Sequence, residues 1–248
     1  MATAAILERL TWRPATLESV RHETSTARAL TFIVPGWSGH TAGQHVDLRL
    51  TAPDGYMAMR PYSIGSAPSA EAIKLTVELH PGGEVSSFLT QVASPGMKVE
   101  VRGPLGGWFA WSPALSEPVQ LVAGGSGVVP LVSMLRAHRA VRHPSPMRLL
   151  YSLRTPDSTL YARELSAWRP QPQQVNILYS RRAPAGNGRP PGRLNAADLR
   201  RYAIPADQQP LCYVCGPTPF VETAIGLLLD HGHEPSQIRA ERFGVERT

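Results

Sequence analysis

Cysteine is scarce in this sequence, which limits the redox and metal chemistry open to the chain. Only Cys212 and Cys215 occur among the 248 residues. Two thiols cannot build a disulfide framework, so we expect a reducing, cytoplasmic location. An iron–sulfur cluster normally takes four cysteine ligands, so we expect this chain alone to hold none.

The eight histidines show no ligand spacing, and no metal site is expected. We interpret four of them, on expected helix ends or loops, as solvated: His138, His143, His231 and His233.

Long apolar runs are also missing. No stretch of about 18 apolar residues occurs, so we expect no transmembrane helix. Residues 1–10 lack a basic region followed by an apolar run, and we interpret them as a short arm before the first strand and not as a secretory signal. No membrane association is expected.

Charged residues are few, at 18% of the chain, whereas apolar residues make up 42%. This balance excludes a disordered chain and allows a buried core. The formal net charge of +6 suggests an acidic partner, a phosphate-bearing ligand or nucleic acid. No basic run with interleaved aromatic residues occurs, so we do not expect nucleic-acid binding.

The chain has two parts with different patterns. From Thr11 to about Phe109, short alternating apolar runs are broken by proline and glycine, which predicts a small antiparallel β-barrel. Strands are expected at 29–34, 45–50, 73–79 and 98–102, with one short helix within 85–92. From Val119 onward, strands and helices alternate, which predicts a parallel sheet with helices on both faces. A proline-containing boundary within 111–118 separates two expected domains, 1–112 and 113–248.

In the second part, the starts and ends of the expected strands and helices can be read from the sequence. Strands are expected at 119–123, 149–153, 175–179, 211–214 and 238–243. Helices are expected at 130–142, from Asp157 or Ser158 to Trp168, and after Asn195 as N-cap. A last helix is expected with Thr218 as N-cap and Gly232 just past its end.

One motif is the turn Gly124-Gly125-Ser126-Gly127, which follows an expected strand and leads to a helix containing Pro130. Glycines there let the backbone approach a pyrophosphate, and the helix N-terminus offers N–H groups. An ordinary strand–helix turn fits equally well. The usual third glycine is replaced by Pro130, and no acidic residue ends the second strand, so the common dehydrogenase fingerprint fails.

A second motif is Arg60-Pro61-Tyr62-Ser63-Ile64 on an expected barrel strand. An arginine can fork onto a phosphate, and a tyrosine can lie against a flat ring. A serine can hydrogen-bond to a ring nitrogen. On its own, the motif is also compatible with a routine amphipathic strand end.

The order of five motifs is more specific than any one of them. They are Arg60-Pro61-Tyr62-Ser63, Gly83-Glu84-Val85-Ser86, the Gly125-to-Pro130 turn, Cys215-Gly216-Pro217 and Glu241-Arg242-Phe243-Gly244. Along nearly the whole chain, this order resembles the ferredoxin–NADP reductase superfamily. The second half is similar to reductase components of bacterial oxygenases without their ferredoxin domain.

The resemblance implies an N-terminal flavin-binding barrel followed by a Rossmann-like NAD(P)-binding domain. It implies that Arg60 binds the flavin pyrophosphate, that Tyr62 packs on the isoalloxazine and that Ser63 hydrogen-bonds near N5. The implied site continues, in chain order, through Pro61, Ile64, Gly83, Val85, Ser86, Gly124, Gly125, Ser126, Gly127, Pro130, Cys215, Gly216, Pro217, Glu241 and Phe243. In this assignment Cys215 lies beside the nicotinamide, Glu241 and Phe243 close the flavin site, and the catalytic residues are Ser63, Cys215 and Glu241. Only four residues follow Gly244, so no long C-terminal aromatic lid is expected.

Two further sets of residues bear on the cofactors. Ser152, Arg154, Ser180 and Arg181 follow the second and third strands of the second part, where Arg and Ser together suit a 2′-phosphate. A solubilising loop edge is the alternative, and we favour NADPH over NADH. Cys212 and Cys215 are three apart on a strand and should face opposite sides, so a redox dithiol is not expected.

The resemblance implies an FAD-dependent oxidoreductase that passes a hydride from NAD(P)H to FAD. Electrons then go to a separate acceptor, such as an acidic ferredoxin or another iron–sulfur or haem protein. Three alternatives stay open: a reductase for an unlinked oxygenase or other redox enzyme, a flavin or ferric-chelate reductase, and a non-catalytic electron-transfer subunit.

Overall fold

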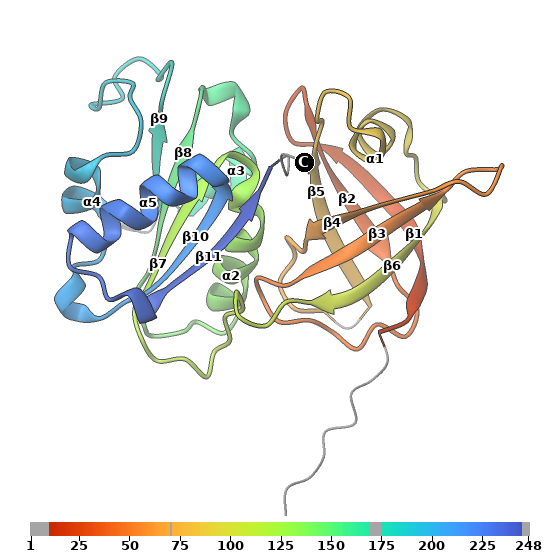
Figure 1. The fold of residues 1–248 in the computed structure, drawn as a ribbon, viewed down its shortest axis with the longest axis horizontal. Helices are drawn as coiled ribbons and strands as arrows, with labels where there is room; N and C mark the ends of the chain where they lie inside the picture. The colour runs from red at the N-terminus through yellow and green to blue at the C-terminus, as the bar shows by residue number, and fades with distance from the viewer. Residues whose placement is uncertain (1–9, 70, 169–174, 245–248) are drawn as a thin grey trace, which may run out of the picture.

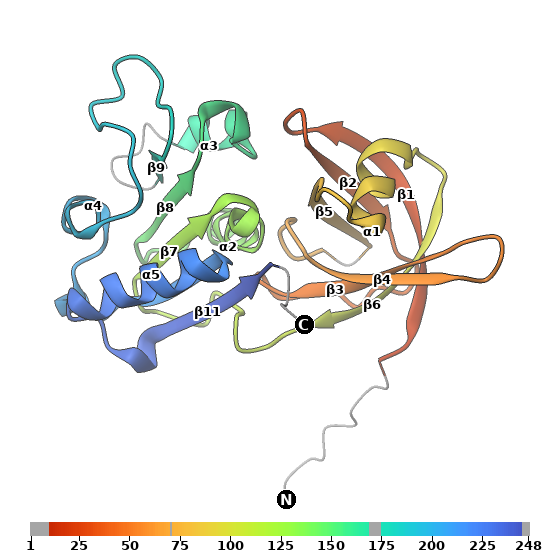
Figure 2. The same ribbon diagram turned by 45° about the horizontal axis from the view of Figure 1, so that its top comes forward.

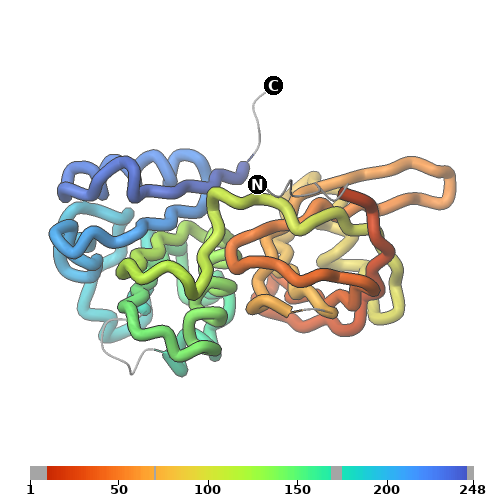
Figure 3. Tube along the Cα trace, turned by 90° about the horizontal axis from the view of Figure 1, so that it is seen from below, coloured from red at the N-terminus to blue at the C-terminus, as the bar shows by residue number. Residues whose placement is uncertain are grey.

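The computed structural model describes residues 10–69, 71–168 and 175–244. Two lobes lie side by side, and the chain crosses from one to the other once, through the segment after β6 (Figures 1 and 3). None of the helices in these ranges has the length and apolar character needed to span a lipid bilayer.

The first lobe is a six-stranded antiparallel barrel, as the alternating pattern predicts. Its strands are β1 (Trp12–His22), β2 (Ala27–Ile33), β3 (His45–Thr51), β4 (Met57–Ser63), β5 (Ala72–Glu78) and β6 (Lys98–Leu105). Their order is β4-β3-β6-β1-β2-β5, and a bridge between Ile64 and Leu75 brings the two edge strands together. A short helix α1 (Glu84–Ser87) and a π-helical turn η1 (Phe88–Val92) follow β5.

Strand alternation explains the barrel core. Val46 and Leu48 of β3 point into the barrel and are fully buried. Asp47 and Arg49 point outward, where they pair with Arg102 and Glu100 of β6. The same strand therefore supplies the core on one face and an ion-pair ladder on the other.

The second lobe is a five-stranded parallel sheet of order β11-β10-β7-β8-β9. Its strands are β7 (Val119–Gly124), β8 (Met147–Leu153), β9 (Val175–Tyr179), β10 (Leu211–Pro217) and β11 (Ile238–Phe243). Its helices are α2 (Val128–Ala140), α3 (Ala162–Trp168), α4 (Ala196–Tyr202) and α5 (Thr218–Asp230). As predicted, helices cover both faces of the sheet, with α2 and α5 on opposite sides (Figure 2).

Each face of this sheet has its own core. Leu121 and Ala123 of β7 pack with α2 residues, whereas Val122 packs with residues of α4 and α5. Cys215 belongs to the first core and Cys212 to the second, and both thiols are free. The two cysteines therefore face opposite sides, as expected.

Three expectations about the second lobe need correction. The helix expected from Asp157 or Ser158 is broken, because Tyr161 adopts a left-handed backbone (φ 56°) and α3 begins only at Ala162. Thr218 is the first helical residue and not the N-cap, since Pro217 takes the cap position in an extended conformation. His138 and His233 are buried and not solvated: the His138 ring bonds to the Ser145 carbonyl at 2.7 Å, and the His233 ring lies 3.6 Å from the Cys212 sulfur.

Candidate functional site

A cavity of about 390 Å³, called here the barrel-side cavity, lies where the two lobes meet. The barrel contributes His45, Pro61, Tyr62, Ser63, Thr76 and Glu78 to its lining, and the second lobe contributes Ser126, Val129, Glu241, Arg242 and Phe243. The predicted β4 motif and the predicted end of β11 therefore face one space, although about 180 residues separate them in the sequence.

The β4 motif presents a neutral aromatic ring and a hydroxyl to this cavity. Burial raises the pKa of Tyr62 to about 12, so its phenol stays protonated while the ring packs against the barrel core. Ser63 lies opposite His45 in the β3–β4 pairing, which explains why both line the cavity. Arg60 is exposed and donates to the Met59 carbonyl at 2.6 Å, whereas Ile64 is fully buried.

The turn before α1 lies close to the start of β4. Tyr56 donates to Glu84 at 3.2 Å, which connects the β3–β4 hairpin to α1. The Ser86 hydroxyl is occupied within the turn, since it donates to the Gly83 carbonyl at 3.1 Å. A Cβ on Gly83 would come within 2.6 Å of that hydroxyl, so a side chain there would displace the Ser86 hydroxyl from its bond. Val85 is buried in the barrel core.

A second cavity of about 470 Å³, called here the sheet-edge cavity, lies at the carboxyl edge of the parallel sheet. It is lined by Glu78, Gly124, Gly125, Ser126, Ser152, Leu153, Arg154, Ser158, Leu160, Ser180, Arg193, Leu194, Pro217, Pro219, Phe220 and Thr223. Glu78 and Ser126 line both cavities, so the two spaces are adjacent.

The glycine turn after β7 forms an open backbone surface at the sheet-edge cavity. Gly125 has a left-handed backbone (φ 55°), and a Cβ there would meet no atom within 4 Å. A Cβ on Gly127 would lie 2.1 Å from the Cys215 carbonyl oxygen, so only glycine lets the turn pack on β10. The turn leads into the 13-residue helix α2, whose buried Pro130 needs no backbone donor in the first turn. This arrangement fits a pyrophosphate, because open backbone at a helix N-terminus binds anions.

Cys215 and Glu241 lie side by side on paired strands β10 and β11. The Cys215 side chain is fully buried, and burial, followed by the charge of Glu241, raises its pKa well above the ordinary value, so the thiol is neutral. It lines neither cavity, and its role beside a nicotinamide stays a prediction. Glu241 lines the barrel-side cavity, and burial raises its pKa to about 7. This carboxyl group can therefore hold or release a proton near neutral pH.

The sheet-edge cavity has two arginines in its lining. Of the residues assigned to the 2′-phosphate, Ser152, Arg154 and Ser180 line it, whereas Arg181 is exposed and lies outside the lining. Arg193 also lines it and was not predicted.

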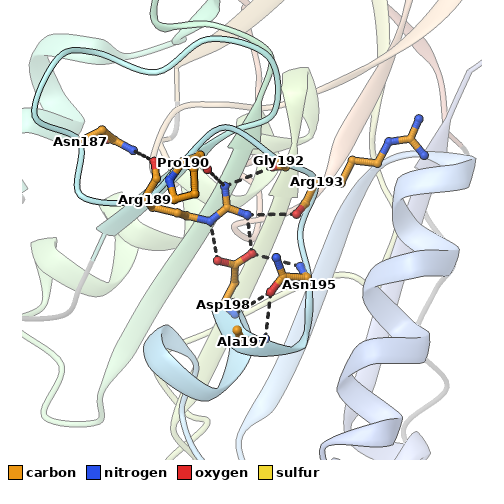
Figure 4. Close-up of polar contacts among 8 residues, drawn as sticks. All are labelled: Asn187, Arg189, Pro190, Gly192, Arg193, Asn195, Ala197 and Asp198. Atoms are coloured by element: carbon orange, nitrogen blue, oxygen red, sulfur yellow. Dashed lines mark hydrogen bonds and ion pairs between the residues drawn. The ribbon is translucent and has the colours of Figure 1, made fainter.

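The loop that carries Arg193 is held by contacts among Arg189, Asp198 and Asn195, called here the clamp (Figure 4). Arg189 forms a buried ion pair with Asp198 and donates to the carbonyls of Pro190, Gly192 and Arg193. Asp198 accepts from the Asn195 backbone at 3.1 Å, and the Asn195 side chain caps α4 as predicted.

Comparison with known proteins agrees with this geometry. Residues 14–109 match the model of the oxidoreductase FAD-binding domain, and residues 121–225 match that of the oxidoreductase NAD-binding domain. The FAD/NAD-binding domain of a nitric oxide dioxygenase from Vibrio cholerae superposes with a TM-score of 0.81 at 21% identity, covering 94% of this chain and 99% of that one. The chain belongs to the ferredoxin–NADP reductase superfamily and carries its FAD-binding and NAD-binding domains.

Curated relatives include longer proteins. The glycine betaine monooxygenase reductase subunit of Pseudomonas aeruginosa is 34% identical over 210 residues, which is 82% of this chain and 56% of the relative. The toluate 1,2-dioxygenase electron transfer component of Pseudomonas putida is 27% identical, over 82% of this chain and 58% of the relative. This chain thus spans little more than half the length of these relatives.

Proposed function

We propose that this chain binds FAD in the barrel-side cavity and a reduced nicotinamide coenzyme in the sheet-edge cavity, and transfers reducing equivalents to a separate redox protein. The observation that carries this proposal is the adjacency of the two cavities, which share Glu78 and Ser126. Bound FAD would supply the chemistry, since a flavin accepts a hydride from a nicotinamide and returns electrons singly.

The chain's own residues would bind the two cofactors and orient them. Tyr62 would offer its ring to the isoalloxazine and Ser63 a hydroxyl near N5. Arg60 is exposed and would exchange its bond to the Met59 carbonyl for the flavin pyrophosphate. Glu241 would hold a proton at its carboxyl group beside the flavin. The proposal divides the chain into an FAD-binding domain, 1–112, and an NAD(P)-binding domain, 113–248.

The test is anaerobic stopped-flow mixing of the purified yellow protein with NADH or NADPH, followed at the flavin absorption bands. Arg60→Ala should lower flavin occupancy, because the phosphate loses a forked partner. Ser63→Ala and Cys215→Ala should slow flavin reduction while leaving flavin bound. A colourless protein that takes up no added flavin would end the proposal, and wild-type rates in both of the latter variants would refute the placement of the site.

We infer that NADPH is preferred over NADH. Two arginines, Arg154 and Arg193, line the sheet-edge cavity together with several serines, and Glu78 is the single acidic residue among the described residues that line it. Arg154→Ala and Arg193→Ala should therefore weaken NADPH binding more than NADH binding. Arg181→Ala, in the same assay, decides whether that exposed side chain also reaches the phosphate. Equal losses for both coenzymes in every variant would reject the 2′-phosphate assignment.

We propose an acidic iron–sulfur protein, such as a ferredoxin, or an oxygenase component as the electron acceptor. The support is the naming of the relatives as a monooxygenase reductase subunit and a dioxygenase electron transfer component, together with the net charge of +6. Mixing the reduced chain with an acidic ferredoxin and following ferredoxin absorbance tests this assignment. We also propose a cytoplasmic location, because two cysteines are too few for the disulfide framework of a secreted domain.

A further inference from the structure

A buried tyrosine of the second lobe is hydrogen-bonded to the barrel beside the two cavities. Tyr161 is the residue directly before α3. It is almost fully buried, and its hydroxyl donates to Thr76 of β5 at 2.7 Å. Burial raises the pKa of Tyr161 to about 12, so the hydroxyl stays protonated and can keep donating. The bond joins the second lobe to the barrel across 85 positions of sequence.

The bond runs from a residue next to one cavity wall to a residue in the other wall. Thr76 lines the barrel-side cavity, and Leu160, the residue before Tyr161, lines the sheet-edge cavity. A displacement of Tyr161 therefore moves one wall relative to the other.

The tyrosine is held in an unfavourable backbone conformation by contacts from both lobes. Its φ of 56° lies in the left-handed region, which bulky residues rarely adopt. Its backbone N–H donates to Glu23 of the barrel at 3.0 Å. The Arg136 guanidinium lies 4.8 Å from the Tyr161 ring centroid, bonds to the barrel carbonyl of Gly65 and pairs with Glu164. A Cβ on Gly65 would come within 2.8 Å of the Tyr161 hydroxyl, so the absence of a side chain there makes room for it.

We propose that Tyr161 is a positioning residue for transfer between the two cofactors: its bond to Thr76 sets the spacing of the flavin and coenzyme walls. This inference rests on the proposed function. Hydride transfer needs reacting atoms within about 3–3.5 Å, and a shift of about 1 Å can slow a reaction a hundredfold. Loss of one hydrogen bond, with the ring still in place, should produce a smaller shift and a roughly tenfold slower transfer.

The experiment is stopped-flow reduction of the flavin-loaded protein over a range of coenzyme concentrations. Tyr161→Phe should lower the limiting rate at saturating coenzyme about tenfold, while the half-saturating concentration and the flavin content stay near those of the wild type. Tyr202→Phe, on α4 and outside the lining of both cavities, is the matched control and should change none of these three quantities. A merely structural role would lower the thermal midpoint without lowering the limiting rate of the fully flavin-loaded protein.

Thr76 supplies a second route to the same answer if Tyr161→Phe folds poorly. Thr76→Val removes the acceptor and should slow reduction, and Thr76→Ser should restore much of the lost rate. Both substitutions remove the same hydrogen bond. The limiting rate of the double variant, Tyr161→Phe with Thr76→Val, should therefore be only slightly lower than that of the slower single variant. Suppose that the coenzyme reduces the flavin of the wild type. If Tyr161→Phe then has the same limiting rate as the wild type, or if Thr76→Ser is as slow as Thr76→Val, the positioning role is wrong and the proposed function still stands. A wild type that neither coenzyme reduces would instead refute the proposed function.

Discussion

Glu241 combines an ionisable group with a mostly buried position at a cavity wall. Burial favours its neutral acid and raises its pKa from the usual 4.5 to about 7. The folded protein therefore binds this proton more tightly than the unfolded chain does. The free energy of unfolding should fall as pH rises from about 4.5 to about 7, by up to about 3 kcal/mol, and the loss should be complete above pH 7.

Urea unfolding at pH 5 and pH 8 measures this contribution. Glu241→Gln removes the titration, so its loss of stability between the two pH values should be smaller than that of the wild type. Glu234→Gln alters an exposed glutamate and is the control. Equal pH dependence in wild type and Glu241→Gln would show that burial does not shift this carboxyl group.

Two glycines of the second lobe should respond in opposite ways to the same change. Gly127→Ala forces a methyl group against the Cys215 carbonyl, so it should destabilise the protein by about 1–3 kcal/mol and displace the turn from β10. Gly226→Ala, within α5, meets no atom within 4 Å and should stabilise the protein by about 0.5–1 kcal/mol, because alanine favours a helix. Chemical denaturation measures both. A neutral Gly127→Ala would contradict the packing described for the turn.

At the scale of elements, the loop before α4 depends on one ion pair. Arg189 and Asp198 keep only 12% and 6% of their side chains exposed. Arg189→Ala leaves the Asp198 charge buried without its main partner, so it should cost about 3–5 kcal/mol in unfolding free energy. It should also weaken coenzyme binding, since the loop that carries Arg193 loses its clamp.

A compensating change separates the two effects of that substitution. Arg189→Ala combined with Asp198→Asn removes the unpaired charge and should recover part of the stability but not the coenzyme affinity. Urea unfolding and coenzyme titration of both variants provide the comparison. Full recovery of affinity in the double variant would show that the clamp does not position Arg193.

Elements were more predictable than the residues that meet between them. The pattern of apolar residues predicted the observed bounds of β9 and β11, and Asn195 was correctly predicted to cap α4. Both signals depend only on neighbouring residues in the sequence. The break at Tyr161 was missed because its left-handed backbone depends on contacts with the barrel. His45 was missed because its place opposite Ser63 depends on strand register. Motifs located the β4 and glycine-turn residues, whereas Arg193 reaches the cavity only through the folding of its loop.

At the scale of the whole molecule, a net charge of +6 should favour an acidic partner. Redox encounters are usually small and transient, so turnover with an acidic ferredoxin should fall as salt rises, with screening over about 10 Å at 0.1 M. Flavin reduction by NADH, measured separately, should depend less on salt. A ferredoxin turnover that is flat, or that rises steadily from the lowest salt, would remove electrostatic docking and leave the flavoenzyme proposal standing.

The order of strands along the chain also has a consequence for biosynthesis. Every strand of the barrel lies between Trp12 and Leu105, and its central pairing joins β1 to β6. In the second sheet, β7 at Val119 pairs with β10, which begins only at Leu211. A growing chain can therefore close its barrel on the ribosome while most of the second lobe is still untranslated. The coenzyme-binding sheet, by contrast, can pair β7 with β8 early, but it is complete only after its last two strands, β10 and β11, have been synthesised.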